Sequence, residues 1–215
     1  MSGLRTTATA VLVRVRRLSR QYRTRPSTYT RTTILGVTSV FFLELAAVRL
    51  LGGGSVERLV GYLFVRYPLP TWVLAPVLHR DVGHWAVNVG MLGLLLPVES
   101  SLSKRNYGAL FFGAGVVSTY FGGWYLLTFG NEPTVAFYGT SGFVYGLAGF
   151  ALCDVGSRRR RAEADWVVFC IGISALVVVA SDLLAALSSP LALNPGHVFG
   201  FVVGVGVWTT GRLVD

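Results

Sequence analysis

Long apolar stretches dominate this chain and restrict it to a membrane fold. A helix needs about 20 apolar residues to cross a hydrocarbon core of ~30 Å. A bilayer offers the backbone no water, so a spanning segment must satisfy its own hydrogen bonds, as an α-helix does. Only 13% of the 215 residues are charged and 53% are hydrophobic, whereas soluble domains are roughly 25% charged. The sequence therefore predicts an all-α polytopic membrane protein.

Six stretches have the composition of spanning helices. They are residues 33–51, 84–97 (starting about one turn earlier), 107–129, 135–153, 165–187 and 197–213. Glu44 and Arg49 interrupt the first, and we expect them to face protein or the interface rather than lipid. Residues 55–78 contain three prolines and two arginines, which favours an interfacial or partly embedded loop over a further span.

The distribution of positive charge supports this count. With the N-terminus in the cytosol, fifteen of the nineteen basic residues lie on the cytosolic side, as the positive-inside rule requires. We therefore expect a multi-pass protein of the cell membrane with both termini cytosolic. Residues 1–32 are interpreted as an Arg-rich cytosolic tail and residues 33–215 as one membrane domain. The net charge of +9 then reflects topology and contact with anionic lipid, not nucleic-acid binding.

Polar residues stand at the outer ends of the second, fourth and sixth predicted spans. Peptide hydrolysis by a serine needs a base within hydrogen-bond reach of the hydroxyl and donors aimed at the oxyanion. Ser141 and His197 fit the nucleophile and its base. His84 and Asn88 are four residues apart, hence on one helical face, and fit the oxyanion donors together with the Ser141 amide.

The fourth and sixth spans carry small residues that let two backbones approach closely. These are Gly139, Gly142, Gly146 and Gly149 on the fourth span and Gly196, Gly200 and Gly204 on the sixth. Tyr145 lies one turn from Ser141 on the same face, which suits packing of its ring on His197.

These motifs resemble the rhomboid family of intramembrane serine proteases in its minimal six-helix form. The resemblance rests on Gly139-x-Ser141-Gly142 followed by Tyr145, on His84-x-x-x-Asn88, and on His197-x-x-Gly200-x-x-x-Gly204. Two departures are Gly196, where the family usually has alanine, and the absence of the Trp-Arg pair common in the first outer loop.

The resemblance implies a Ser141–His197 dyad without a third carboxylate, and an oxyanion hole formed by His84, Asn88 and the Ser141 amide. Tyr145 is implied to stack on His197, and Gly139 and Gly200 to support the site. It further implies a water-filled cavity open to the outside. Substrates would be single-pass transmembrane proteins cut near the outer face, with gating by the fifth span and residues 188–195.

Two other functions fit parts of the pattern. A transition-metal site on His79, His84 and His197 uses a common ligand type, but it leaves Ser141 unexplained. A non-catalytic protein that binds membrane clients is the second, although relatives of that kind lack the serine or the histidine. Asp182, a lone acid in the fifth span, is interpreted as a structural hydrogen-bond partner or a polar contact to the outer loop and is not assigned to catalysis. We therefore expect a serine endopeptidase that uses no metal and no cofactor.

The two cysteines, Cys153 and Cys170, fall in or beside apolar spans on the expected cytosolic side. A disulfide framework is therefore not predicted.

Overall fold

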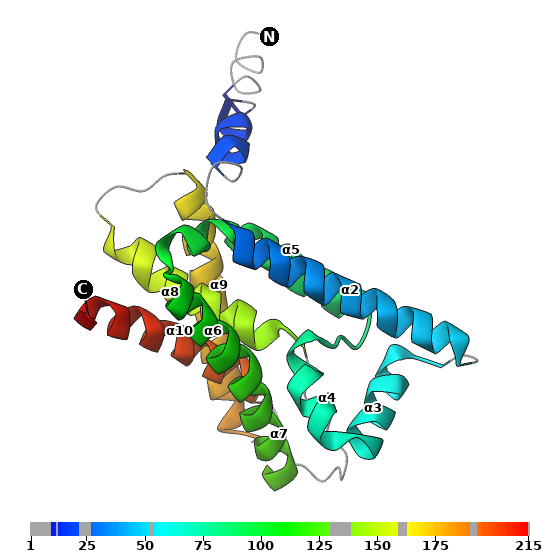
Figure 1. The fold of residues 1–215 in the computed structure, drawn as a ribbon. Helices are drawn as coiled ribbons and strands as arrows, with labels where there is room; N and C mark the ends of the chain where they lie inside the picture. The colour runs from blue at the N-terminus through cyan, green and yellow to red at the C-terminus, as the bar shows by residue number, and fades with distance from the viewer. Residues whose placement is uncertain are drawn as a thin grey trace, which may run out of the picture.

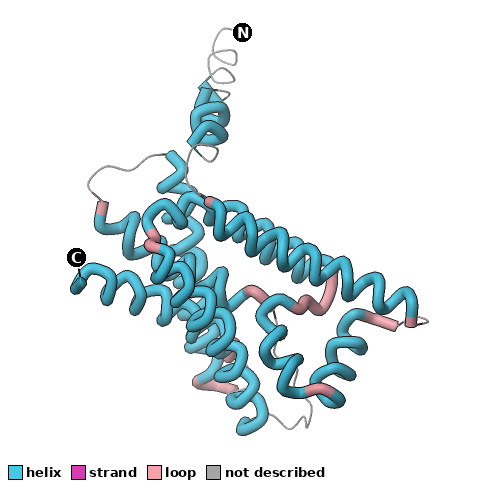
Figure 2. Tube along the Cα trace, in the orientation of Figure 1, coloured by secondary structure: helices cyan, strands magenta, loops and turns pink. Residues whose placement is uncertain are grey.

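The computed structural model describes residues 10–11, 13–21, 27–51, 54–129, 139–158, 163–189 and 193–214, and no strand occurs in these ranges. Figure 1 shows α2 and α5 side by side, next to a bundle that contains α6 to α10. Figure 2 shows that the described part of the chain is almost entirely helical. The helices are α2 (Thr28–Leu50), α3 (Val56–Arg66), α4 (Pro68–Leu74), η1 (Ala75–Val77), α5 (Val82–Leu95), η2 (Leu96–Ser101), α6 (Lys104–Leu110), η3 (Phe111–Val117), α7 (Ser118–Phe129), α8 (Ser141–Ser157), α9 (Glu163–Ala186) and α10 (Pro195–Val214).

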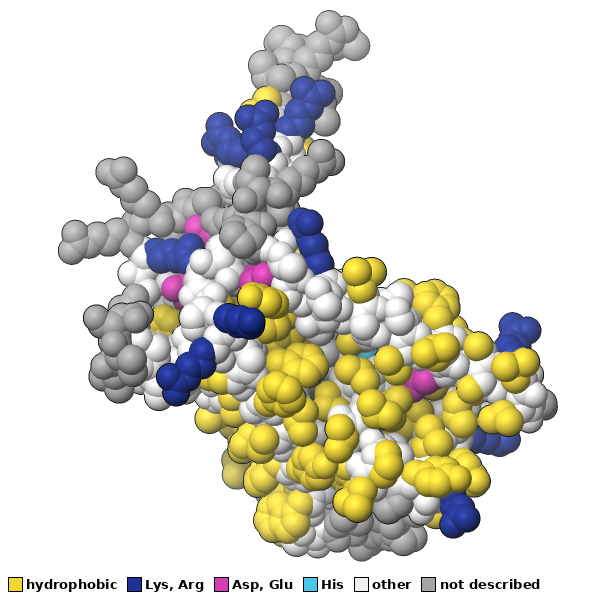
Figure 3. Space-filling model, in the orientation of Figure 1, with side chains coloured by type: hydrophobic (Ala, Val, Ile, Leu, Met, Phe, Trp, Pro, Cys, Tyr) yellow, Lys and Arg dark blue, Asp and Glu magenta, His cyan; other side chains and the backbone are white. Residues whose placement is uncertain are grey.

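Three helical stretches are long and apolar enough to cross a membrane, judged by length and composition among the described residues. They are 28–50, 82–101 and 165–186. The other three predicted spans correspond to the continuous run α6–η3–α7, to α8, which has only 17 residues, and to α10. Apolar side chains cover a broad band of the face drawn in Figure 3, and Lys and Arg gather at its margins. The chain is therefore an all-helical membrane protein.

The helix α2 is anchored at its beginning by an acid from a distant segment. Glu99, in η2, accepts the backbone N–H of Tyr29 at 3.0 Å and that of Thr30 at 2.7 Å. These donors belong to the first turn of α2, where the helix offers them no acceptor and the helix dipole favours a negative charge. Further along α2, Glu44 is only 5% exposed, so it faces protein rather than lipid, as predicted.

Residues 55–78 form the short helices α3, α4 and η1 rather than a span. Ser55 caps α3 by accepting the N–H of Arg58 at 3.2 Å, and Pro68 occupies the first turn of α4, where its missing N–H costs nothing. With 11 and 7 residues, α3 and α4 are far too short to cross a bilayer. The interpretation of this stretch as an interfacial or partly embedded loop agrees with these lengths.

The third predicted span is a composite helix with a π-helical centre at η3, a feature the apolar pattern does not reveal. A π segment inserts an extra residue into a helix and shifts the register of the turns beyond it. Here Gly115 is buried in the π segment and lies against Phe143 of α8.

The helix at the centre of the bundle is α8. Ten of its residues, from Gly142 to Val155, are buried. It begins at Ser141 rather than at residue 135 as predicted; residues 139 and 140 form a turn, and 135–138 lie outside the described residues. The core around it draws on α5, α6, α9 and α10 and is centred on Leu92, Leu110, Phe143, Leu147 and Val168.

Candidate active site

One cavity opens among α5, α8, α9 and the start of α10. Its volume is about 540 Å³, a size typical of sites that hold a small ligand or a short peptide segment. Its polar lining residues are Glu57, Arg80, His84, Asn88, Ser141, Tyr145, Ser174, Asn194 and His197. The predicted nucleophile, base and oxyanion side chains therefore face one space.

The position of Ser141 is set by the turn that precedes it. Gly139 has a φ of 123°, a conformation that residues with a Cβ rarely adopt. A Cβ there would also lie 2.5 Å from Cε1 of His84. The Gly139 N–H donates to the carbonyl of Ala75 at 2.8 Å. The turn thus requires glycine, and it leaves the Ser141 amide at a helix N-terminus, where backbone donors have no helical acceptor.

His197 lies in the first turn of α10 and is held there by Asn194. The Oδ1 atom of Asn194 accepts the backbone N–H of His197 at 3.3 Å, as an N-cap residue does. With Oδ1 used in this way, the Nδ2 group faces the imidazole and donates to its Nε2 atom at 3.2 Å. Nε2 is therefore the unprotonated ring nitrogen, which is the form a general base needs.

Tyr145 fixes the plane of the imidazole. Its ring stacks on His197 with centroids 4.1 Å apart and an interplanar angle of 10°. Ser141 is one turn before Tyr145 on the same face of α8. Among the described residues, the side chain that hydrogen-bonds Nε2 is the amide of Asn194 rather than the Ser141 hydroxyl. Such contacts often tighten only when substrate binds.

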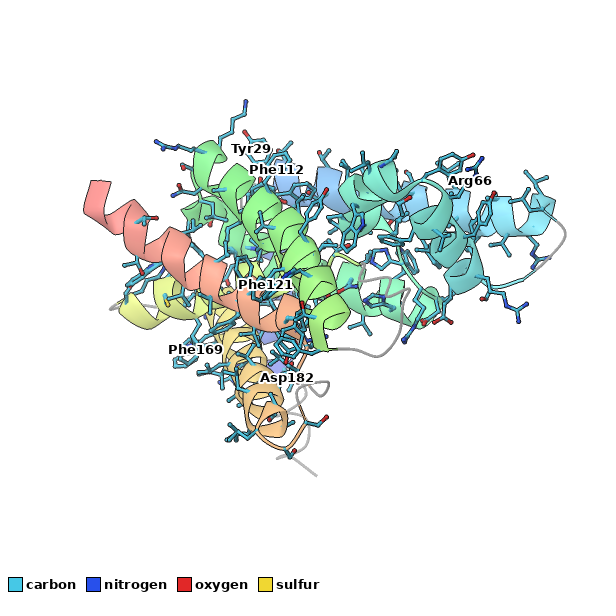
Figure 4. All side chains as sticks on the ribbon, turned by 90° about the horizontal axis from the view of Figure 1, so that it is seen from below. Tyr29, Arg66, Phe112, Phe121, Phe169 and Asp182 are labelled. Carbon is cyan, nitrogen blue, oxygen red and sulfur yellow. The ribbon has the colours of Figure 1, made fainter. Side chains whose placement is uncertain are left out.

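A carboxylate stands on the other side of the imidazole. Oδ2 of Asp182 lies 3.6 Å from Nδ1 of His197, and neither atom has a hydrogen-bond partner among the described residues although both are buried. Asp182 belongs to the C-terminal part of α9 (Figure 4). The prediction that Asp182 is only a structural partner, and the implied absence of a third carboxylate, did not anticipate this proximity.

His84 and Asn88 line the cavity from α5. Asp81 caps the start of the helix, since its Oδ1 accepts the N–H of His84 at 2.8 Å, so His84 lies in the first turn. Asn88 is only 4% exposed, and its Nδ2 has no hydrogen-bond partner among the described residues. Leaving a buried donor unpaired costs about 1–3 kcal/mol, and such groups call for an explanation. A free donor in the same cavity as Ser141 is what stabilisation of an oxyanion requires.

Gly200 lies where α10 crosses α8. A Cβ at this position would overlap the backbone of Gly142, the residue after Ser141. Glycine at 200 therefore permits the contact that brings the two helices, and with them Ser141 and His197, to the same cavity.

His79 is fully buried, at 0% exposure, and the cavity-lining residues do not include it. Its two ring nitrogens contact the Val77 carbonyl and the Thr140 hydroxyl, so neither nitrogen is offered to a metal. No group of three His, Cys, Asp or Glu side chains suited to a metal ion occurs within the described ranges.

Asn194 is a site residue that the sequence reasoning missed. Its signal was present, because asparagine followed by proline marks a helix start, and the helix that starts there carries His197.

A known protein family matches most of the chain. The Rhomboid domain profile matches residues 68–212, a range that includes every residue of the candidate site except Glu57. No match to the chain was found among curated proteins. The profile covers well over half of the 215 residues. The chain therefore belongs to the rhomboid family, whose members are intramembrane serine proteases.

Proposed function

We propose that the protein is a serine endopeptidase that cleaves transmembrane helices near the outer membrane face, with Ser141 as nucleophile and His197 as general base. The observation that carries the proposal is the stack of Tyr145 on His197, one helical turn from Ser141 and in the same cavity. The stack fixes the orientation of the imidazole, and its unprotonated Nε2 atom is the form that general-base catalysis requires.

The reaction follows from these positions. The Ser141 hydroxyl replaces the Asn194 amide at Nε2, its oxygen attacks the scissile carbonyl carbon, and its proton passes to Nε2. The oxyanion that forms is stabilised by the Ser141 N–H, by Nδ2 of Asn88 and by the His84 ring. His197 then returns the proton to the leaving amine, and water from the cavity hydrolyses the acyl-enzyme.

In this proposal six helical segments span the membrane, both termini are cytosolic, and residues 33–215 form the membrane domain. The cavity then opens toward the outer face between α5 and α9. Single-pass substrates that unwind easily are favoured, because an intact helix hides its carbonyls in hydrogen bonds.

Labelling with a fluorophosphonate probe tests the nucleophile. We expect the detergent-solubilised wild type to be labelled at Ser141, as mapped by mass spectrometry of the adduct. Ser141→Ala and His197→Ala should lose the label. Ser174 is a matched control, because it lines the same cavity and its hydroxyl is bonded to the Cys170 carbonyl. Ser174→Ala should label normally. A folded but unlabelled wild type would instead favour a client-binding protein.

Asp182→Asn is expected to lower kcat by about 10- to 100-fold with little change in KM. A carboxylate near Nδ1 stabilises the imidazolium that forms when His197 takes the proton, and each tenfold in rate corresponds to ~1.4 kcal/mol. The effect should be smaller than the ~10⁴-fold of a fully hydrogen-bonded triad, because the contact is 3.6 Å long. Ser181→Ala, which alters a neighbouring hydroxyl bonded within α9, is the control. Wild-type kcat in Asp182→Asn would remove Asp182 from the mechanism.

A further inference from the structure

Three buried polar side chains behind the cavity join segments that are far apart in the sequence. Glu44 of α2 is 5% exposed, and both His79, between η1 and α5, and Thr140, before α8, are 0% exposed. The cavity-lining residues do not include any of them. Burying polar groups costs free energy unless they are hydrogen-bonded. The hydrogen bonds of these three side chains therefore have to be identified.

The His79 ring is held in one tautomer by its two neighbours. Nδ1 lies 3.1 Å from the Val77 carbonyl oxygen. A carbonyl only accepts, so Nδ1 carries the proton. Nε2, 3.3 Å from Oγ1 of Thr140, is then the acceptor, and the Thr140 hydroxyl donates to it. Burial lowers the pKa of His79 to about 4, which keeps the ring neutral at physiological pH.

Glu44 holds the backbone of the same residue. Its two carboxylate oxygens lie 3.4 and 3.3 Å from the His79 N–H. Phe41, one turn earlier on α2, meets the His79 ring edge to face at 6.2 Å between centroids. Through these contacts α2 holds the segment that leads into α5 in place.

These contacts reach the two segments that carry the oxyanion donors. His79 packs against His84, with ring centroids 5.2 Å apart. Thr140 directly precedes Ser141, whose amide is a proposed donor. The His79–Thr140 hydrogen bond therefore ties the His84 side of the site to the Ser141 side, from behind the cavity.

We propose that Glu44, His79 and Thr140 are positioning residues, which fix the spacing between His84 and the Ser141 amide. The inference rests on the proposed function. It gives α2 a role in catalysis that does not require α2 to contact the substrate.

Thr140→Val tests the hydrogen bond, because valine has the shape of threonine without its hydroxyl. We expect the limiting rate of fluorophosphonate labelling to fall about tenfold with unchanged probe affinity; a 1 Å misplacement of catalytic groups can cost roughly a hundredfold. Thr140→Ser, which keeps the hydroxyl, should restore the rate. Thr71→Val is the matched control, since Thr71 is also buried and its hydroxyl bonds the Leu63 and Tyr67 carbonyls away from the site.

A second pair of variants covers the case in which Thr140→Val does not fold. Glu44→Gln keeps an oxygen acceptor for the His79 N–H and should label near the wild-type rate, whereas Glu44→Leu should be about tenfold slower. The proposal is overturned if Thr140→Val and Glu44→Leu both label at the wild-type rate. It is also overturned if the control Thr71→Val is slowed as much as Thr140→Val. An unlabelled wild type would overturn the proposed function instead, so the two failures are distinguishable.

Discussion

Ser141→Ala and His197→Ala are each expected to lower kcat for a transmembrane-helix peptide by about 10⁴-fold or more, and the double variant should be no slower than either single one. Both residues act in one proton transfer, so removing either removes the same step. The stack of Tyr145 on His197 supports this expectation, because it fixes the plane of the base in the cavity that Ser141 also lines. Single-turnover cleavage of a peptide with small residues at the cut site measures the effect.

The outcome that contradicts this prediction is additivity. If the double variant lost the product of the two single effects, Ser141 and His197 would act independently and would not be nucleophile and base for each other. The residual cleavage rate shared by all three variants should come only from the oxyanion donors and from substrate binding. Removing the Asn88 amide in the Ser141→Ala background should then lower that residual rate further.

The order of the predicted spans and five of the cavity-lining residues, His84, Asn88, Ser141, Tyr145 and His197, were predictable because both depend on local patterns. Apolar length marked each predicted span, and the spacing of His84 and Asn88 put them on one face. The turn at Gly139 was readable as a helix start, although α8 begins six residues later than predicted. The small-residue spacing on α8 and α10 also indicated that these two helices touch.

The features that could not be predicted depend on the rotation of one helix against another. Asp182 reaches His197 only because of how α9 faces α10, and no periodicity in α9 encodes that angle. Glu44 is similar, since its partner is a backbone N–H thirty-five residues away. The π segment η3 escaped notice because its residues are as apolar as those of an ordinary helix.

Gly204→Ala is expected to destabilise the protein, whereas Gly206→Ala should be neutral or slightly stabilising. A Cβ at Gly204 would overlap the backbone of Gly146 in α8. That backbone cannot give way as a flexible side chain does, and overpacking of this kind costs about 1–3 kcal/mol or more. A Cβ at Gly206 meets nothing within 4 Å, and alanine is favoured over glycine in a helix by about 1 kcal/mol.

The two variants make the same chemical change two residues apart on α10. A difference between their effects on stability therefore isolates the contact between α8 and α10. Thermal unfolding in detergent micelles measures the stability, and fluorophosphonate labelling below the transition reports the site. Because the contact between α8 and α10 brings Ser141 and His197 to the same cavity, Gly204→Ala should lose labelling as it loses stability. Equal melting temperatures for the two variants would show that close backbone approach at Gly204 does not hold the site together.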